Sequence, residues 1–229
     1  MHIKGLQKTT LLDFPSRVAC TVFTGGCNFR CPFCHNASLV LSPGSVDGIP
    51  EEDFFSFLSK RKGILDGVCI TGGEPLLQRD IVDFIRKIKN EGFAVKLDTN
   101  GSFPDRLKDI VSEGLIDYVA MDIKNSEEKY SLTAGVEGDC SEVFESIDFI
   151  MSSGVDYEFR TTVVKELHTV EDIESIAKRI AGARRYFLQS FKDSGDLICP
   201  DYSAHSEEIL REMVEKASPF VEVCQLRGV

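Results

Sequence analysis

Three cysteines, Cys27, Cys31 and Cys34, lie within eight residues in the stretch CNFRCPFCHN, and His35 follows the last of them directly. Thiolate and imidazole groups at such spacing can bind zinc, an iron–sulfur cluster or covalent haem, and two of the thiols could instead form a redox disulfide. The stretch is therefore a candidate metal or redox centre, and the choice depends on how many ligands it supplies.

Zinc, haem and a redox pair are the weaker interpretations of this stretch. Structural zinc sites usually draw their ligands from two separated pairs, and no second CxxC occurs in the chain. The CxxCH pattern of haem attachment and the CxxC of a thioredoxin-like pair both leave Cys27 unused. A 4Fe-4S cluster held by three thiolates uses every cysteine and leaves one iron without a protein ligand, whereas electron-carrying ferredoxins use four cysteines. Such an open position can bind a substrate or cosubstrate.

The composition limits the class of protein. The 229 residues, 42% of them hydrophobic, are enough for a single domain over residues 1–229. No apolar stretch reaches the roughly 18 to 20 residues that cross a bilayer, and no signal-peptide core is visible at the start, so a cytoplasmic protein without a membrane partner is expected. The net charge of −11 argues against a nucleic-acid surface. Cys20 and Cys69, which lie in apolar runs, are expected to be small buried hydrophobes.

Short β-branched or aromatic runs alternate with amphipathic segments along the chain. The runs predict strands over 17–23, 67–71, 93–99, 118–123, 157–164 and 186–191, with a possible further strand at 220–226. Apolar residues at helical spacing predict helices from Leu77 to Gly92, from Pro104 to Gly114, from Val143 to Gly154, after a capping box at Thr169, and over 206–216. Six βα units imply a parallel sheet, either doubly wound or part of a βα barrel.

Polar residues and glycines follow five of the predicted strands. In both parallel architectures ligands bind at the carboxyl ends of the strands. One such group could be an ordinary turn, but five at one edge predict a ligand site. The groups are Gly25-Gly26 with the cysteines, Gly72-Gly73-Glu74, Asp98-Thr99-Asn100-Gly101, Asp122-Ile123-Lys124 and Gln189-Ser190.

The cysteine spacing after the first predicted strand, together with GGEP after the second, resembles the radical S-adenosylmethionine (radical SAM) superfamily. Within it, CPFCHN, GGEPLLQ, DTNG and MDIK resemble the glycyl-radical-enzyme activases over residues 13–124, and the segment TTLLDFPSRVACTVFTGGCNFRCPFCHN is most similar to activating proteins of anaerobic ribonucleoside-triphosphate reductase. Gly25 departs from the Gln of many relatives. Residues 36–68 contain no cysteine, which disfavours activases with an inserted ferredoxin-like domain.

The resemblance implies a partial (βα)6 TIM-like barrel of radical SAM type with a cluster loop at 24–36. It implies that Cys27, Cys31 and Cys34 hold one 4Fe-4S cluster and that S-adenosylmethionine (SAM) binds the fourth iron. A monovalent cation beside Asp98 and Asp122 is also implied, because two carboxylates would repel the carboxylate of SAM, although Lys124 could provide the same compensation. The implied SAM contacts are Phe33, Gly72, Gly73, Glu74, Asp98, Thr99, Asn100, Asp122, Lys124, Arg160 and Gln189.

Some of these implied contacts carry a specific role or an alternative. The carboxylate of Glu74 is expected to meet the amino group of SAM, with Gly72 and Gly73 allowing the chain to approach closely. Phe33 is expected near the adenine, or simply as a core residue. Arg160 could equally form a salt bridge at the rim, and Gln189 stands where a related activase has histidine.

The implied activity is reductive cleavage of SAM, followed by removal of a hydrogen atom from a glycine of a partner enzyme. The expected partner is the large subunit of anaerobic ribonucleotide reductase, and the expected electron donor is a flavodoxin or a ferredoxin. The alternatives are an activase of another glycyl radical enzyme such as pyruvate formate-lyase, a radical SAM enzyme acting on a small molecule, and a non-catalytic iron–sulfur or zinc protein.

Overall fold

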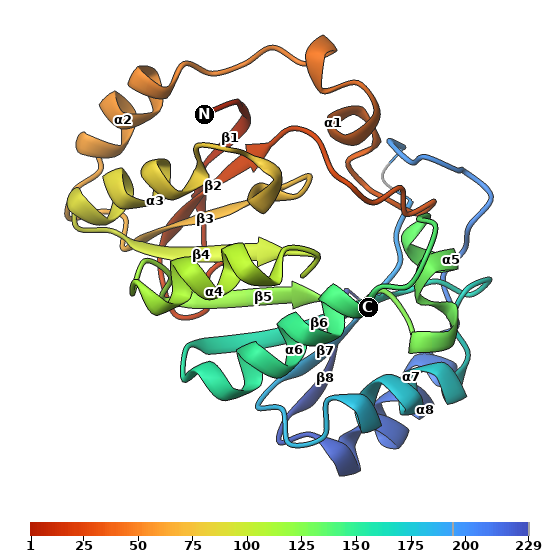
Figure 1. The fold of residues 1–229 in the computed structure, drawn as a ribbon. Helices are drawn as coiled ribbons and strands as arrows, with labels where there is room; N and C mark the ends of the chain where they lie inside the picture. The colour runs from red at the N-terminus through yellow and green to blue at the C-terminus, as the bar shows by residue number, and fades with distance from the viewer. Residues whose placement is uncertain (194, 229) are drawn as a thin grey trace.

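The computed structural model describes residues 1–193 and 195–228, and its strands form a single sheet (Figure 1). The strands pair in the order in which they occur along the chain, from β1 to β8. They are β1 (Ile3–Thr10), β2 (Ala19–Thr24), β3 (Gly67–Gly72), β4 (Ala94–Thr99), β5 (Tyr118–Asp122), β6 (Asp156–Val163), β7 (Tyr186–Ser190) and β8 (Cys224–Arg227).

The sheet is a partial barrel. Strands β2 to β8 are parallel, and β1 pairs antiparallel with β2. Because the strand order is sequential and never reverses, the doubly wound alternative is excluded. The predicted α/β class with a parallel sheet is confirmed, and the further strand near the C-terminus is present. That strand begins at Cys224 because Ser218–Phe220 form a 3₁₀ turn.

Most helices lie along the outer side of the curved sheet, whereas α1 (Ala37–Leu41) and α5 (Tyr130–Ala134) lie beyond the carboxyl ends of the strands (Figure 1). The other helices are α2 (Glu51–Ser59), α3 (Ile81–Asn90), α4 (Pro104–Ser112), α6 (Ser141–Ser153), α7 (Val170–Arg179) and α8 (Glu207–Ala217). In the described part of the chain, none of the helices is long and apolar enough to cross a lipid bilayer.

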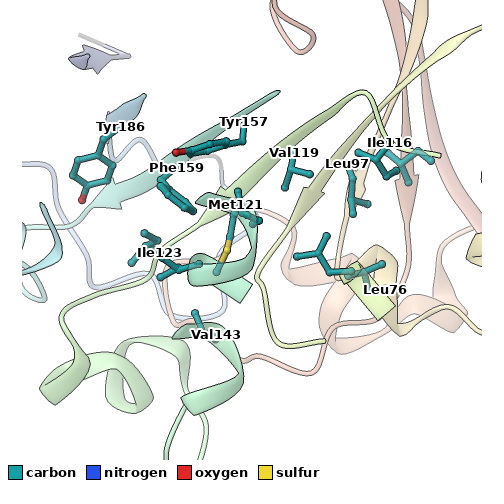
Figure 2. Packing of buried hydrophobic residues seen from close by; sticks show 14 of the residues in the cluster. Leu76, Leu97, Ile116, Val119, Met121, Ile123, Val143, Tyr157, Phe159 and Tyr186 are labelled. Atoms are coloured by element: carbon teal, nitrogen blue, oxygen red, sulfur yellow. The ribbon is translucent and has the colours of Figure 1, made fainter. Parts of the chain in front are cut away.

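The apolar core fills the space between the sheet and these helices. Alternate residues of a strand face opposite sides of the sheet. Leu97, Val119 and Phe159 are fully buried on the helix side, where Leu76 and Val143 also belong to the core cluster (Figure 2). Val119 and Met121 lie on the same face of β5, two residues apart, as this alternation requires.

Several features of the fold differ from the sequence predictions, and helices α1, α2 and α5 are among the elements that were not predicted. Strand β1 was not predicted, because only Ile3 and Thr10 of its eight residues are buried and the pattern of an edge strand is therefore weak. The helix after GGEP begins at Ile81 rather than at Leu77. Pro75 to Leu77 form a 3₁₀ turn that the buried carboxylate of Glu74 caps, and Leu77 is left 39% exposed.

The opposite face of the sheet, which lines the barrel interior, is strongly charged. Lys96 and Asp98 of β4 and Glu158 and Arg160 of β6 occupy alternate positions on their strands. Lys96 and Glu158 are each only 2% exposed. Arg227 of β8 binds Glu158 through two hydrogen bonds of 2.9 and 3.0 Å. Buried charges are costly unless each has an opposite partner, so the charged side chains of the barrel interior must form ion pairs. These ion pairs set the positions of the charged groups at the carboxyl ends of the strands.

Replacing Thr169 tests the predicted capping box, which the structure confirms at the start of α7. The Thr169 hydroxyl accepts a hydrogen bond from the Asp172 amide, and the Asp172 carboxylate accepts one from the Thr169 amide at 2.9 Å. Thr169→Ala should lower the free energy of unfolding by about 1 kcal/mol in urea titrations. Thr169→Ser keeps the hydroxyl and should match the wild type. Equal stabilities for the alanine variant and the wild type would contradict the role of the box.

Candidate cofactor site at the carboxyl ends of the strands

A cavity of about 280 Å³ lies at the carboxyl ends of the parallel strands. It brings together the three predicted cysteines and every predicted SAM contact except Glu74. The lining residues are Cys27, Phe29, Cys31, Phe33, Cys34, His35, Asn36, Val40, Thr71, Gly72, Gly73, Asp98, Thr99, Asn100, Asp122, Lys124, Arg160, Thr162 and Gln189.

Several lining residues were not assigned as contacts from the sequence. Thr162 lies two residues after Arg160 on β6, so the alternation of the strand would have placed both side chains on the same face. Thr71 directly precedes the two glycines. Phe29 and Val40 carry no chemical signal in the sequence, because only the fold of the cluster loop brings them to the cavity.

The cluster loop, residues 24–36, rests against the turn that contains Gly72 and Gly73. A β-carbon on Gly73 would lie 1.9 Å from the carbonyl oxygen of Gly26, and one on Gly72, whose φ is +111°, would lie 2.4 Å from the Thr24 nitrogen. The Glu74 amide donates to the Gly26 carbonyl at 2.9 Å. The glycines were expected to let the chain approach SAM. In the structure, the close approach that they allow is between two protein loops.

Other parts of the chain also hold the cluster loop. The Arg30 amide donates to the Ala134 carbonyl at 2.9 Å, and the Cys199 amide donates to the Pro32 carbonyl at 2.8 Å. The Asn36 side chain donates to the Gly72 carbonyl at 3.1 Å. A loop without regular secondary structure between residues 25 and 36 is thus fixed by backbone contacts to distant segments.

The three thiols are free and differ in burial, with Cys31 buried and Cys27 and Cys34 half-buried. Burial raises the pKa of the Cys27 thiol to about 11 and that of Cys31 to about 12. Binding of a metal at these positions would release their protons. Three soft thiolates suit an iron–sulfur cluster.

The arrangement of possible ligands does not resemble a single-ion site. In residues 1–193 and 195–228, no three His, Cys, Asp or Glu side chains are placed to hold one metal ion. A tetrahedral zinc ion needs its ligands gathered around one point, whereas in an iron–sulfur cluster each cysteine binds a separate iron.

Glu74 differs from its predicted role, because its side chain lies beneath the cavity lining. The carboxylate is fully buried and accepts hydrogen bonds from the Thr99 hydroxyl at 2.9 Å and from the Asn100 and Leu76 amides at 2.7 and 3.0 Å. These donors belong to the DTNG turn after β4 and to the turn after GGE itself. The carboxylate therefore ties two strand ends together instead of facing the space where SAM is expected.

Burial raises the pKa of the Glu74 carboxyl from 4.5 to about 7, although the hydrogen bonds from Asn100, Leu76 and Thr99 act in the opposite direction. A buried carboxylate without a partner cation prefers to hold its proton. The folded protein therefore binds this proton more tightly than the unfolded chain does.

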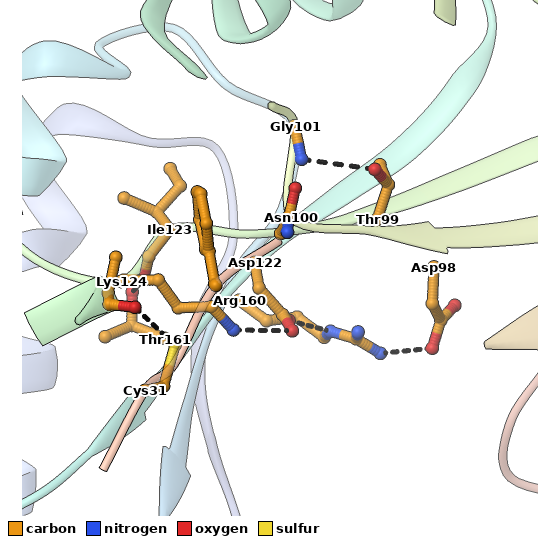
Figure 3. Close-up of polar contacts among 12 residues, drawn as sticks. Cys31, Asp98, Thr99, Asn100, Gly101, Asp122, Ile123, Lys124, Arg160 and Thr161 are labelled. Carbon is orange, nitrogen blue, oxygen red and sulfur yellow. Dashed lines mark hydrogen bonds and ion pairs between the residues drawn. The ribbon is translucent and has the colours of Figure 1, made fainter. Parts of the chain in front are cut away.

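Asp98, Arg160, Asp122 and Lys124 form a row of alternating charges across the cavity (Figure 3). Arg160 Nη1 lies 3.0 Å from Asp98 Oδ2, and Arg160 Nε lies 2.9 Å from Asp122 Oδ1. Lys124 Nζ lies 3.1 Å from Asp122 Oδ2. Arg160 thus forms the ion pairs that were the alternative to a SAM contact, and it also lines the cavity.

The carboxylates of this row remain ionised. Burial would raise the pKa of Asp122, but Arg160 and Lys124 outweigh burial and hold the pKa at about 2. Burial acts likewise on Asp98, where Arg160 and Lys96 keep the pKa below its ordinary value. The monovalent cation was predicted because two carboxylates would repel the carboxylate of SAM. In the structure, Lys96 and Arg160 pair with Asp98, and Arg160 and Lys124 pair with Asp122.

Asn100 and Phe33 are both partly engaged by protein neighbours. The Asn100 side-chain Nδ2 donates to Asn28 Oδ1 at 3.1 Å and lies 3.7 Å from Cys27 Sγ, so it joins the cluster loop to the turn after β4. The Phe33 ring is 4% exposed and packs edge-on against His168 with ring centroids 6.4 Å apart. Because Phe33 also lines the cavity, it is a core residue and a wall of the site together.

Comparison with known families gives one domain match. The family model described as the radical SAM superfamily matches residues 21–181, which run from within β2 through the cluster loop to the end of α7.

Two curated relatives cover different shares of the chain. A protein of Methanocaldococcus jannaschii that carries the name of a glycyl-radical enzyme activating enzyme, MJ1227, is 32% identical over 99% of this chain and 96% of its own length. The pyruvate formate-lyase-activating enzyme of Clostridium pasteurianum is 29% identical over 56% of this chain and 54% of its own length.

A solved structure supports the fold. Streptococcus suis SuiB, bound to precursor peptide SuiA, superposes with a TM-score of 0.73 at 15% identity, over 91% of this chain and 48% of the SuiB chain. At that identity the likeness shows the fold alone, and this chain spans about half the length of SuiB.

Gly73→Ala tests the contact between the two loops. Since the added β-carbon would meet a backbone oxygen at 1.9 Å, the cluster loop must shift, and the variant should lose most of the iron that the wild type binds on anaerobic reconstitution. Gly44→Ala is the matched control, because nothing lies within 4 Å of the added carbon there. Iron content by colorimetric assay is the measurement. Full iron loading of Gly73→Ala would show that the contact is not needed.

Glu74→Gln tests the buried carboxyl. The unfolded carboxyl loses its proton near pH 4.5 and the folded one near pH 7, so raising the pH through this window should destabilise the wild type. Relative to Glu74→Gln, which does not titrate, the wild type should lose on the order of 3 kcal/mol of unfolding free energy. Urea unfolding at several pH values measures this difference. A difference that is constant with pH would contradict the raised pKa.

Proposed function

The chain belongs to the radical SAM superfamily, and we propose that it activates a glycyl radical enzyme by removing a hydrogen atom from a glycine of that partner. The observation that carries the proposal is one continuous cavity wall in which the three thiols of the cluster loop meet the charged row from Asp98 to Lys124. The similarity to MJ1227 over nearly the whole of both chains supports the activase class.

In this proposal, Cys27, Cys31 and Cys34 hold a 4Fe-4S cluster. When bound, the cluster supplies an electron that cleaves SAM to methionine and a 5′-deoxyadenosyl radical. Lys124 and Arg160 offer positive charge to the methionine carboxylate, and charge-assisted hydrogen bonds of this kind are strong in a buried site. Phe33 forms an apolar wall suited to the adenine. The largely buried wall keeps water from the reacting atoms.

The partner glycine is proposed to enter from a second cavity of about 560 Å³ inside the barrel. This cavity shares the lining residues Asp98, Arg160 and Gln189 with the first, so the two cavities adjoin. Its mouth carries Leu11 and Leu12, which are 72% and 91% exposed. Two exposed leucines beside an open sheet edge suit a polypeptide segment better than a small polar substrate.

The finer expectations belong to the same proposal. We propose the large subunit of anaerobic ribonucleoside-triphosphate reductase as partner, on the likeness of the segment around the cluster loop, and a flavodoxin or ferredoxin as electron donor. Eight free cysteines favour a reducing compartment such as the cytoplasm. A monovalent cation is not needed, since Lys96, Lys124 and Arg160 already neutralise the two carboxylates.

A second candidate is a radical SAM enzyme that acts on a small molecule. The GTP 3′,8-cyclase of Alkaliphilus oremlandii is 31% identical over 56% of this chain, but the match covers only 41% of that enzyme. The rest of the cyclase has no counterpart in this alignment, whereas the match to MJ1227 is nearly complete on both sides. The activase is therefore the better-supported candidate.

The test is anaerobic reconstitution with iron and sulfide, reduction with dithionite and addition of SAM. The loaded protein should release 5′-deoxyadenosine, and co-incubation with an anaerobic ribonucleotide reductase should produce a glycyl radical doublet in electron paramagnetic resonance spectra. Cys31→Ala should abolish both signals. Cys199→Ala, which removes an exposed free thiol, should retain them.

Each result separates the candidates. SAM cleavage without a glycyl radical on the reductase or on a pyruvate formate-lyase would contradict the activase proposal, and consumption of added GTP would favour the cyclase class. A loaded wild-type protein that never cleaves SAM would leave only a non-catalytic iron–sulfur protein.

A further inference from the structure

Lys96 is a buried ammonium group to which the sequence assigns no role. It lies on β4, two residues before Asp98, and only 2% of its side chain is exposed. Its Nζ forms an ion pair with Asp98 Oδ1 and lies 3.8 Å from Cys69 Sγ and 6.0 Å from the centre of the Tyr118 ring. A thiol and a ring stabilise a cation weakly, so Asp98 is the partner that holds this charge in the barrel.

Lys96 and Arg160 divide the Asp98 carboxylate between them. Lys96 pairs with Oδ1, while Arg160 Nη1 lies 3.0 Å from Oδ2. The same guanidinium reaches Asp122 through Nε at 2.9 Å. Because Lys96 binds Oδ1 of Asp98, only Oδ2 is left for the Arg160 guanidinium. Arg160 therefore binds Asp98 and Asp122 at the same time and lies between them at the cavity wall.

The charges of the row do not cancel when Lys96 is included. Three cations, Lys96, Lys124 and Arg160, face two carboxylates, Asp98 and Asp122, which leaves one positive charge. Without Lys96 the row would be neutral. The carboxylate of SAM is the group that can pair with this surplus charge, since the amino group and the sulfonium of SAM are themselves positive.

Other charges near Lys96 are engaged elsewhere. Glu158 binds Arg227 through two hydrogen bonds and accepts one from the Tyr118 hydroxyl at 3.0 Å. Asp13 lines the second cavity, as Lys96 does, and its carboxylate accepts a hydrogen bond from the Thr21 hydroxyl. In the described part of the chain, neither forms an ion pair with Lys96.

We propose that Lys96 is a positioning residue that supplies to Asp98 the positive charge that a bound monovalent cation would otherwise supply. SAM binding in this protein is then independent of sodium and potassium, and it becomes dependent on them when the ammonium group is removed. The inference rests on SAM as the ligand of the first cavity and does not depend on which glycine or partner is attacked.

The experiment measures SAM affinity by anaerobic calorimetry on the cluster-loaded protein. Sodium, potassium and choline chlorides are compared at equal ionic strength, because choline is too large to replace an ammonium group in a buried site. Wild-type affinity should be the same in all three salts. Lys96→Met should bind SAM about tenfold more weakly in choline and recover most of that loss in sodium or potassium.

Two further variants separate charge from packing. Lys96→Arg keeps the charge and should remain independent of the salt. Lys108→Met removes a more exposed lysine that pairs with Glu145 and should behave as the wild type. Thermal unfolding without SAM shows whether each variant is folded, and the wild-type comparison of salts needs no variant.

Clear outcomes would overturn the inference. Wild-type SAM affinity that rises with sodium or potassium would show that a cation site exists beside Lys96. Weakened binding in folded Lys96→Met that no cation restores would show a purely structural role. By contrast, normal SAM binding without formation of a glycyl radical would contradict the proposed function and leave this inference intact.

Discussion

The site depends on a backbone contact that only glycine permits. The turn after β3 packs so closely on the cluster loop that a β-carbon at Gly73 would overlap the Gly26 carbonyl oxygen. This contact fixes the loop that carries the three thiols to a rigid strand end, and the Glu74 amide secures it with a hydrogen bond to the same carbonyl. Irregular loops gain precision when regular elements hold them in this way. The cysteines are thereby placed without a helix or strand of their own.

Glu74 extends the same arrangement to the next strand. Its buried carboxylate accepts hydrogen bonds from the Thr99 hydroxyl and the Asn100 amide, and the Asn100 side chain in turn reaches Asn28 and Cys27 in the cluster loop. The ends of β3 and β4 and the cluster loop therefore form a closed set of contacts. A substitution at any residue of this set is expected to shift the other residues, because a buried polar group that loses its hydrogen-bonding partner is destabilising.

Below this set, the barrel interior is held by charge pairing. The carboxylates of Asp98 and Asp122 alternate with three cations, those of Lys96, Arg160 and Lys124. These charges can be buried because each has an opposite partner. The outer face of the same strands is apolar and packs against the helices. Along β4 and β6, alternate side chains therefore face the apolar core and the charged cavity. The same two strands contribute to the stability of the barrel and to the electrostatics of its cavity.

The sequence by itself determined the order of the parallel strands, the cysteine cluster and the gathering of polar residues at one edge, because hydrophobic periodicity and parallel pairing are local and regular. Tertiary structure decided what individual side chains do there. Glu74 turned away from the cavity because Thr99 and Asn100 donate to it, and Lys96 entered the site because alternate positions of β4 face the barrel. The sequence pattern shows which groups are present, but only folding sets which opposite charges and hydrogen-bonding partners meet.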